Sequence, residues 1–143
     1  MSNLSVYESR TGKINCGSEP VFNFVADMRN FKRFLPEDKI QNWEASAGEC
    51  SFEVSPVGRS EIKIVRRDPF DTVKYAGHGM NNTEFYIWVQ LKEIARGDTR
   101  VKLTIKAGLN PGLKMIASKP INDFLEKLVQ GMEKFSDWEN TDQ

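Results

Sequence analysis

Residues 110–135 of this 143-residue chain read NPGLKMIASKPINDFLEKLVQGMEKF, and this segment decides the fold. Asn110 followed by Pro111 is typical of a helix start, because asparagine caps free backbone N–H groups and proline lacks an N–H that the first helical position leaves unbonded. At about 100° per residue, one broad face collects the apolar residues Leu113, Ala117, Ile121, Phe124, Leu125, Leu128, Met132 and Phe135. The sequence therefore predicts a long C-terminal helix with one side to bury.

Pro120 divides this predicted helix. An interior proline removes one backbone hydrogen bond and clashes with the carbonyl four residues earlier, here that of Ile116. The apolar stripe is dense after Pro120 and looser before it, where Gly112 and Ala117 are small. We therefore predict that the segment before Pro120 moves or kinks, so that its hydrogen exchange is faster than that of the segment beyond.

The chain before this helix alternates apolar and polar residues, as strands do. Its first segment, Ser5 to Asn15, predicts a long and rather polar strand near a sheet edge, with Val6 and Ile14 on one face. Six further strands are expected over residues 40–44, 50–54, 60–67, 72–79, 83–93 and 101–107. The turns between them are too short for helical crossovers, so these strands are expected to be antiparallel.

Two short helices are expected between the first strand and the others. Gly17 to Pro20 favours a helix start, with Ser18 as its N-cap. Phe31 to Phe34 favours a second helical turn that ends before Pro36. The prediction is an α+β fold in one domain, residues 1–143, with six to seven antiparallel strands and a long last helix.

The composition is that of an ordinary globular domain. Hydrophobic residues make up 39% and charged residues 28%, and 20 basic residues balance 20 acidic ones. A zero net charge argues against nucleic-acid binding, and no window approaches the ~18 apolar residues of a membrane span. The N-terminus lacks the charged and apolar regions of a signal peptide, so a cytoplasmic location is expected. The acidic tail from Asp137 to Gln143 is expected to fray.

The sequence holds few residues suited to metals or cofactors. Cys16 and Cys50 are the only cysteines and show no CxxC or Cys/His spacing. Two unpaired thiols are the favoured interpretation, with a single disulfide left open. One histidine without a cysteine cluster is no zinc signature, and no GxGxxG or P-loop sequence occurs. We therefore expect neither a metal nor a cofactor.

Acid/base catalysis would need a buried ionisable side chain, and three residues are candidates: Asp27, Glu84 and His78. By alternation, His78 lies on the face opposite Val73 and Tyr75, away from the core, which favours a solvated histidine. Asp27 is better explained by a bridge within its own turn, and Glu84 by a solvated strand end. No catalytic motif is found, so the sequence favours a protein that is not an enzyme.

The order of these segments resembles the START-like superfamily, also called the birch-pollen-allergen-like or SRPBCC superfamily. The resemblance covers nearly the whole chain and rests on Lys13-Ile14-Asn15, Ser18-Glu19-Pro20-Val21-Phe22, Asp27-Met28-Arg29-Asn30-Phe31 running to Leu35-Pro36, Trp43-Glu44, the strand 85–91 and Asn110-Pro111. It implies a helix-grip fold, in which a curved antiparallel sheet wraps the C-terminal helix. It also implies a hydrophobic cavity between sheet and helix, used in this superfamily for lipids, isoprenoids, polyketides or plant hormones.

The implied cavity would be lined by residues of both elements: Phe52, Tyr75, Gly77, Phe85, Ile87, Ile105, Ala107, Leu113, Ile116, Ala117, Ile121 and Phe124. Small residues such as Gly77, Ala107 and Ala117 mark either ligand volume or close contact between elements, and both interpretations stay open. Tyr75 offers a polar group that would orient a ligand. The segment before Pro120 would then gate the cavity.

Three functions follow as hypotheses. The first is binding or carriage of a small apolar molecule, such as a lipid, isoprenoid or polyketide-like compound. The second, from superfamily relatives, is a polyketide cyclase/dehydrase-like enzyme that cyclises or hydrates its substrate in the same cavity. The third is a co-chaperone-like module that uses an exposed apolar patch at Tyr86 and Trp88. A protein partner or a homodimer is therefore left open. Cover by long side chains of a neighbouring strand is the favoured alternative for that pair.

Overall fold

The computed structural model describes residues 4–34, 38, 40–54, 58–79 and 83–139. Its elements are β1 (Ser5–Glu8), β2 (Gly12–Ile14), α1 (Ser18–Val25), the 3-10 helix η1 (Met28–Phe34), β3 (Ile40–Ala45), β4 (Glu49–Val54), β5 (Gly58–Asp68), β6 (Thr72–His78), β7 (Glu84–Ala95), β8 (Asp98–Ala107) and α2 (Pro111–Lys134). This order of helices and strands is the predicted one.

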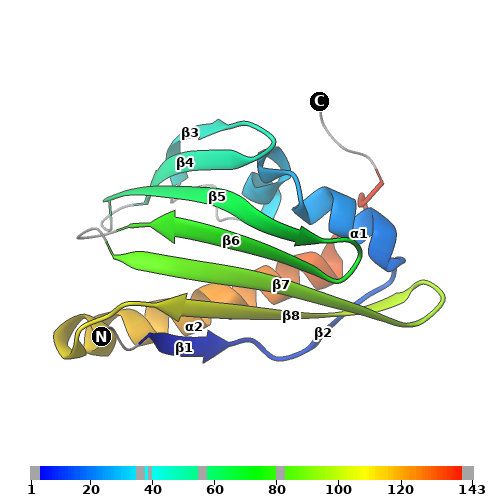
Figure 1. The fold of residues 1–143 in the computed structure, drawn as a ribbon. Helices are drawn as coiled ribbons and strands as arrows, with labels where there is room; N and C mark the ends of the chain where they lie inside the picture. The colour runs from blue at the N-terminus through cyan, green and yellow to red at the C-terminus, as the bar shows by residue number, and fades with distance from the viewer. Residues whose placement is uncertain (1–3, 35–37, 39, 55–57, 80–82, 140–143) are drawn as a thin grey trace.

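In the described part of the chain, eight strands form one antiparallel sheet in the order β1-β8-β7-β6-β5-β4-β3, and β2 also pairs with β8. Figure 1 shows this curved sheet in front of α2, which runs behind the strands. We call the face toward α2 the inner face and the opposite one the outer face. The α+β prediction is confirmed, although it gave six to seven strands instead of eight.

The additional strand arises because the predicted first strand is divided at Ser9. The Ser9 N–H donates to the Leu103 carbonyl at 2.8 Å, and the Ser9 hydroxyl accepts the Leu103 N–H at 2.9 Å, in place of a regular ladder. The break shifts the alternation by one residue, so that odd-numbered residues face the core before it and even-numbered residues after it. Tyr7 and Ile14 are therefore buried, while Val6 is 53% exposed. The prediction that Val6 and Ile14 share a face is therefore wrong, whereas the sheet-edge position of β1 is confirmed.

The start of α1 also differs from the prediction. Gly17 is the N-cap, and Ser18 is the first helical residue. The Ser18 N–H and hydroxyl both donate to the carboxylate of Glu93 on β7, at 2.8 and 3.0 Å. These bonds, with that from the Gly97 N–H, lower the pKa of Glu93. A carboxylate from a distant strand therefore takes the capping role predicted for Ser18.

Helix α2 begins as predicted, because the Asn110 side chain accepts the Leu113 N–H at 2.8 Å. The helix continues through Pro120 to Lys134, but its buried residues all lie in the second half: Leu125, Leu128, Val129 and Met132. That half approaches β2 closely, since a Cβ on Gly12 would lie 2.7 Å from Val129 Cγ1. The second half of α2 is therefore the part of the helix that packs against the sheet and into the core.

An ionic contact at the break between β1 and β2 also holds this second half. The Arg10 guanidinium bonds to Glu133 at 2.7 Å and to Glu126 at 3.1 Å. Together with the Lys13 N–H, it lowers the pKa of Glu133 to about 2. Because these side chains are partly exposed, the contact adds little stability and mainly fixes the position of the helix.

The segment after α2 returns to the core. Trp138 is 2% exposed and lies against the rings of Phe24, Phe34 and Phe135, with centroid distances of 4.8–5.7 Å. The prediction of a frayed tail is therefore wrong at Trp138, and residues 140–143 lie outside the described part of the chain. Among the described residues, no helix is long and apolar enough to cross a membrane.

Candidate functional site

The predicted cavity residues divide into three groups. The first group is buried by the protein itself: Phe52, Tyr75, Gly77, Ile87, Ile105 and Ala107. The second group is half-buried: Phe85, Leu113, Ala117, Ile121 and Phe124. Ile116 differs from both, because its side chain is 70% exposed. The middle of the inner face is therefore packed protein, and the incompletely covered apolar surface lies mainly on the first half of α2.

Tyr75 belongs to the packed core. Its hydroxyl donates to the Val25 carbonyl at 2.7 Å, its ring lies 5.9 Å from that of Phe31, and its side chain is fully buried. Burial raises the pKa of the Tyr75 hydroxyl. Because the hydroxyl already bonds to the end of α1, the expectation that Tyr75 orients a ligand is not supported.

Gly77 is small because two elements approach closely there. A Cβ on Gly77 would lie 2.6 Å from the Phe85 ring and 2.6 Å from the Glu61 backbone oxygen. Of the two interpretations that the sequence leaves open, close contact therefore describes Gly77. The Phe85 ring occupies the volume that a side chain at position 77 would need.

We expect Gly77→Ala to lower the free energy of unfolding by about 1–3 kcal/mol, because the added methyl group overpacks the sheet. Urea denaturation followed by circular dichroism measures this change. Gly48→Ala is the matched control, since a Cβ there would meet nothing within 4 Å. A Gly77→Ala protein as stable as wild type would show that the Phe85 ring moves away freely.

A hydrogen bond joins the first half of α2 to the sheet. The hydroxyls of Tyr7 on β1 and Ser118 are hydrogen-bonded at 2.8 Å, and Ser118 also donates to the Lys114 carbonyl at 2.6 Å. No residue of α2 before Leu125 is buried. This half of the helix therefore lies beside the sheet with its apolar side chains incompletely covered.

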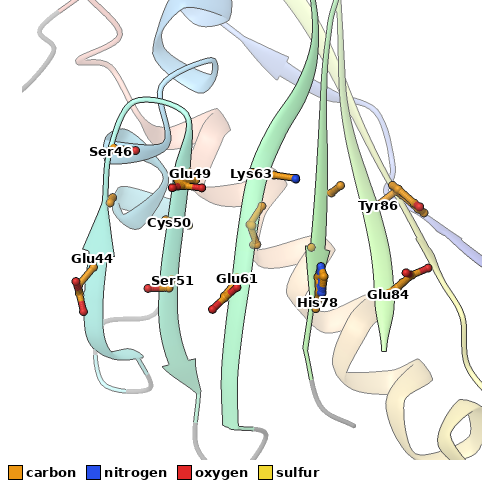
Figure 2. Close-up of a pocket in the computed structure, with 14 residues that line it drawn as sticks. Glu44, Ser46, Glu49, Cys50, Ser51, Glu61, Lys63, His78, Glu84 and Tyr86 are labelled. Atoms are coloured by element: carbon orange, nitrogen blue, oxygen red, sulfur yellow. The ribbon is translucent and has the colours of Figure 1, made fainter. Parts of the chain in front are cut away.

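The outer face carries a groove of about 640 Å³ across β3 to β7. One wall follows the strand register through Glu44, Ser51, Glu61, His78 and Glu84, which are successive cross-strand neighbours. Figure 2 shows these five side chains in one row across the sheet, with α2 behind it. The groove thus lies on the face opposite to the predicted cavity.

The other wall of the groove is formed by Glu49, Lys63, Ala76 and Tyr86, again successive neighbours in the register. Between the walls lies a third row: Ala45, Cys50, Ile62 and Gly77. By alternation this middle row belongs to the inner face, where Cys50 and Ile62 are buried. The floor of the groove is therefore mainly strand backbone.

Comparisons with known proteins identify the fold. No protein-family model and no curated protein matches the chain. Norcoclaurine synthase from Thalictrum flavum has a similar structure, with a TM-score of 0.73 and 9% sequence identity over 93% of this chain and 86% of that one. The chain has the helix-grip fold.

Two further structures share this helix-grip fold. Norcoclaurine synthase in complex with dopamine and hydroxybenzaldehyde matches with a TM-score of 0.64 and 10% identity over 94% of this chain and 90% of that one. A conserved protein from Geobacillus kaustophilus matches with a TM-score of 0.60 and 15% identity over 87% of this chain and 93% of that one. Identities this low show the fold and leave function to the residues themselves.

Within the helix-grip fold, two of the three acid/base candidates come together on the outer face. His78 and Glu84 are direct cross-strand neighbours, and both are exposed, as their positions in the sequence predict. Asp27 lies elsewhere, in an ion pair with Arg29 at 2.6 Å that lowers the pKa of its carboxyl. This is the predicted bridge within its own turn. None of the three is a buried acid on the inner face.

The aromatic pair Tyr86 and Trp88 is covered by lysine side chains. The Lys74 ammonium lies 4.9 and 5.1 Å from their ring centroids, and the Lys106 ammonium lies 5.2 Å from that of Trp88. Both aromatic residues are half-buried. The favoured interpretation from the sequence, cover by a neighbouring strand's long side chains, is confirmed, and the surface there is cationic rather than apolar.

Neither cysteine forms a disulfide. Cys16 is half-buried, and Cys50 is buried, which raises the pKa of its thiol to about 12. In the part of the chain that the structure describes, no group of three or more histidine, cysteine, aspartate or glutamate side chains is arranged to hold a metal ion.

Proposed function

We propose that the protein binds a small apolar molecule between the inner face of the sheet and the first half of α2. The observation that carries the proposal is the half-buried apolar stripe Leu113, Ala117, Ile121 and Phe124, on the part of α2 that contains no buried residue. Globular proteins usually bury such a stripe, because each Å² of apolar area removed from water gains about 25 cal/mol. A ligand seated there would complete this burial.

Two features support this location. The second half of α2 is fixed by its buried residues, so the helix gives the ligand a firm wall on one side. The first half contains no buried residue and is joined to β1 by the hydrogen bond between Tyr7 and Ser118, so fewer packed side chains oppose its adjustment around a ligand. Norcoclaurine synthase, which shares the fold, has been observed with dopamine and hydroxybenzaldehyde bound.

The action of Pro120 as a gate, a cytoplasmic location and the absence of a cofactor remain predictions from the sequence.

A pair of tryptophan substitutions on the same helix tests the proposal. Ala117→Trp fills the proposed space, whereas Met115→Trp places the same side chain at a position that is 87% exposed. With N-phenyl-1-naphthylamine as a neutral fluorescent probe, we expect binding to weaken about tenfold or more in Ala117→Trp and to stay unchanged in Met115→Trp. Equal probe affinity in both variants would exclude this site.

Native mass spectrometry of the protein purified from its own host addresses the ligand itself. A reproducible adduct that is lost in Ala117→Trp and kept in Met115→Trp would identify the molecule bound between sheet and helix. Absence of any adduct, combined with no probe binding, would leave the half-buried stripe without a ligand and contradict the proposal.

The two other hypotheses have less support. A cyclase or hydratase in the inner cavity needs a buried ionisable group, and Asp27, Glu84 and His78 do not supply one there. A co-chaperone surface at Tyr86 and Trp88 needs an apolar patch, and lysine side chains cover these rings. Binding of an apolar molecule is therefore the function that the side-chain positions favour.

A further inference from the structure

We propose that the molecule bound between the sheet and α2 carries an uncharged oxygen group, a hydroxyl or a carbonyl, that hydrogen-bonds to Ser60 on β5. This inference rests on the proposed function and names the chemistry of its ligand. The observation that carries it is a hydroxyl group that the fold buries without giving it a partner. Ser60 is 8% exposed, and its hydroxyl makes no hydrogen bond to any residue in the described ranges of the chain.

Ser60 faces the interior between the sheet and α2. Its direct neighbour on β4 is Phe52, which is buried on the inner face. A Cβ on Gly79 would lie 3.4 Å from the Ser60 Oγ atom and 3.6 Å from the Phe85 ring. The Ser60 hydroxyl and the half-buried Phe85 ring therefore border the same point, and Gly79 has no side chain to fill it.

This point lies at the end of the sheet where α2 begins. Phe85 pairs with Ala107, the last residue of β8, and α2 starts shortly afterwards at Pro111. Figure 1 shows the start of β5, the ends of β6 and β8 and the start of α2 at the same end of the sheet. The half-buried apolar stripe of α2 starts there too, with Leu113. A ligand whose apolar part follows this stripe would have its polar end near Ser60.

Other buried hydroxyl groups of the interior already have partners within the protein. The Tyr75 hydroxyl donates to the Val25 carbonyl at 2.7 Å. The Thr99 hydroxyl donates to the Cys16 carbonyl at 2.6 Å. Folded proteins pair most buried polar groups in this way, because a hydroxyl removed from water costs free energy until something bonds to it. Ser60 departs from this pattern where the polar end of the ligand is expected, so we assign the ligand as its partner.

The surroundings of Ser60 favour a neutral group over a charged one. Its inner-face neighbours Phe52 and Phe85 are aromatic and carry no charge. The residues on either side of it in the chain, Arg59 and Glu61, alternate to the other face and pair with each other at 3.3 Å. A carboxylate or ammonium group at Ser60 would lose its hydration without gaining an opposite charge. The position therefore favours an alcohol, phenol, aldehyde or ketone over a fatty acid or an amine.

Equilibrium dialysis with naphthalene, 2-naphthol and 2-naphthoate at pH 7 tests the proposal. These compounds share the ring system of N-phenyl-1-naphthylamine and differ in carrying no polar group, a neutral hydroxyl or a carboxylate. We expect Ser60→Ala to weaken 2-naphthol binding about three- to tenfold, because one hydrogen bond is lost, and to leave naphthalene binding unchanged. Wild type should bind 2-naphthol about tenfold or more tightly than 2-naphthoate.

Ser51→Ala is the matched control, because Ser51 is a half-buried serine on the outer face of the neighbouring strand β4. It should change none of the three affinities. Thermal unfolding of Ser60→Ala gives a second readout. This variant should unfold at the same temperature as wild type or a higher one, because its missing hydroxyl had no partner in the protein. A lower unfolding temperature would show that the fold itself uses the hydroxyl and would overturn the proposal.

The proposal would also be overturned by equal 2-naphthol affinity in wild type and Ser60→Ala, by an equal loss of naphthalene affinity in that variant, or by wild type binding 2-naphthoate as tightly as 2-naphthol. N-phenyl-1-naphthylamine distinguishes these failures from failure of the site itself. If the probe binds wild type and is weakened in Ala117→Trp, the site between sheet and helix stands, and only the role of Ser60 is refuted.

Discussion

Replacing Trp138 by alanine is expected to lower the free energy of unfolding by about 3–5 kcal/mol. Trp138 is 2% exposed and contacts the rings of Phe24, Phe34 and Phe135, so its removal leaves a large cavity between α1, η1 and the end of α2. Each of the lost edge-to-face contacts adds to the lost burial. Urea denaturation followed by far-ultraviolet circular dichroism measures the change without relying on tryptophan fluorescence.

Two neighbouring substitutions sharpen this experiment. Asp137→Ala alters an exposed side chain, so its effect should stay within about 0.5 kcal/mol. Trp138→Phe should cost much less than Trp138→Ala, because phenylalanine keeps an aromatic ring in the cluster and leaves a smaller cavity. Both substitutions remove the Trp138 Nε1–H, which is buried without a hydrogen-bond partner among the described residues. Losing an unpaired donor relieves a desolvation penalty of about 1–3 kcal/mol, which offsets part of the lost packing. Equal stability of wild type and Trp138→Ala would show that the terminal segment is not part of the core.

The importance of Trp138 was hidden in the sequence. It stands alone among acidic residues after the last helix, without the periodicity that marks a core position. Local patterns identified α2 and the order of the strands well, because amphipathic repeats follow directly from side-chain direction along the chain. A single aromatic residue that closes a cluster of distant segments leaves no such pattern.

Register explains the other differences between prediction and structure. Alternation correctly placed His78 on the face away from the core, but it failed at Val6, because the hydroxyl of Ser9 replaces a ladder partner and changes the parity of the strand. The groove on the outer face depends on the same property. Glu44, Glu61 and Glu84 form one wall only through the registers of successive strand pairs, including a shift in β3. No local reading of the sequence yields such a row.

The hydrogen-bond partners of polar side chains could not be predicted from sequence patterns either. The sequence suggested Tyr75 as a group for a ligand, but the Val25 carbonyl at the end of α1 already accepts its hydroxyl. Likewise Ser18, a good capping residue by type, gives that role to Glu93, 75 residues later in the chain. Residue type indicates which hydrogen bonds are possible, and the fold decides which of them form.

The second large expected effect separates the two halves of α2. Leu125→Ala should lower the free energy of unfolding by about 2–5 kcal/mol, because Leu125 is 1% exposed and lies in the packed half. Leu113→Ala should cost less than about 1 kcal/mol, because Leu113 is half-buried and alanine favours the helix. The same urea experiment measures both, and the pair is matched in residue type, helix and substitution.

Hydrogen exchange extends this comparison to the backbone. Amides between Leu113 and Lys119 should exchange faster than those between Leu125 and Met132, because few buried contacts oppose opening of the first segment and Pro120 deprives Ile116 of a hydrogen bond. Uniform protection along α2, or equal costs of the two leucine substitutions, would mean that the helix behaves as one rigid body. A graded result would mean that the end of α2 near Met132 holds the sheet, while the end near Leu113 is free to adjust around a ligand.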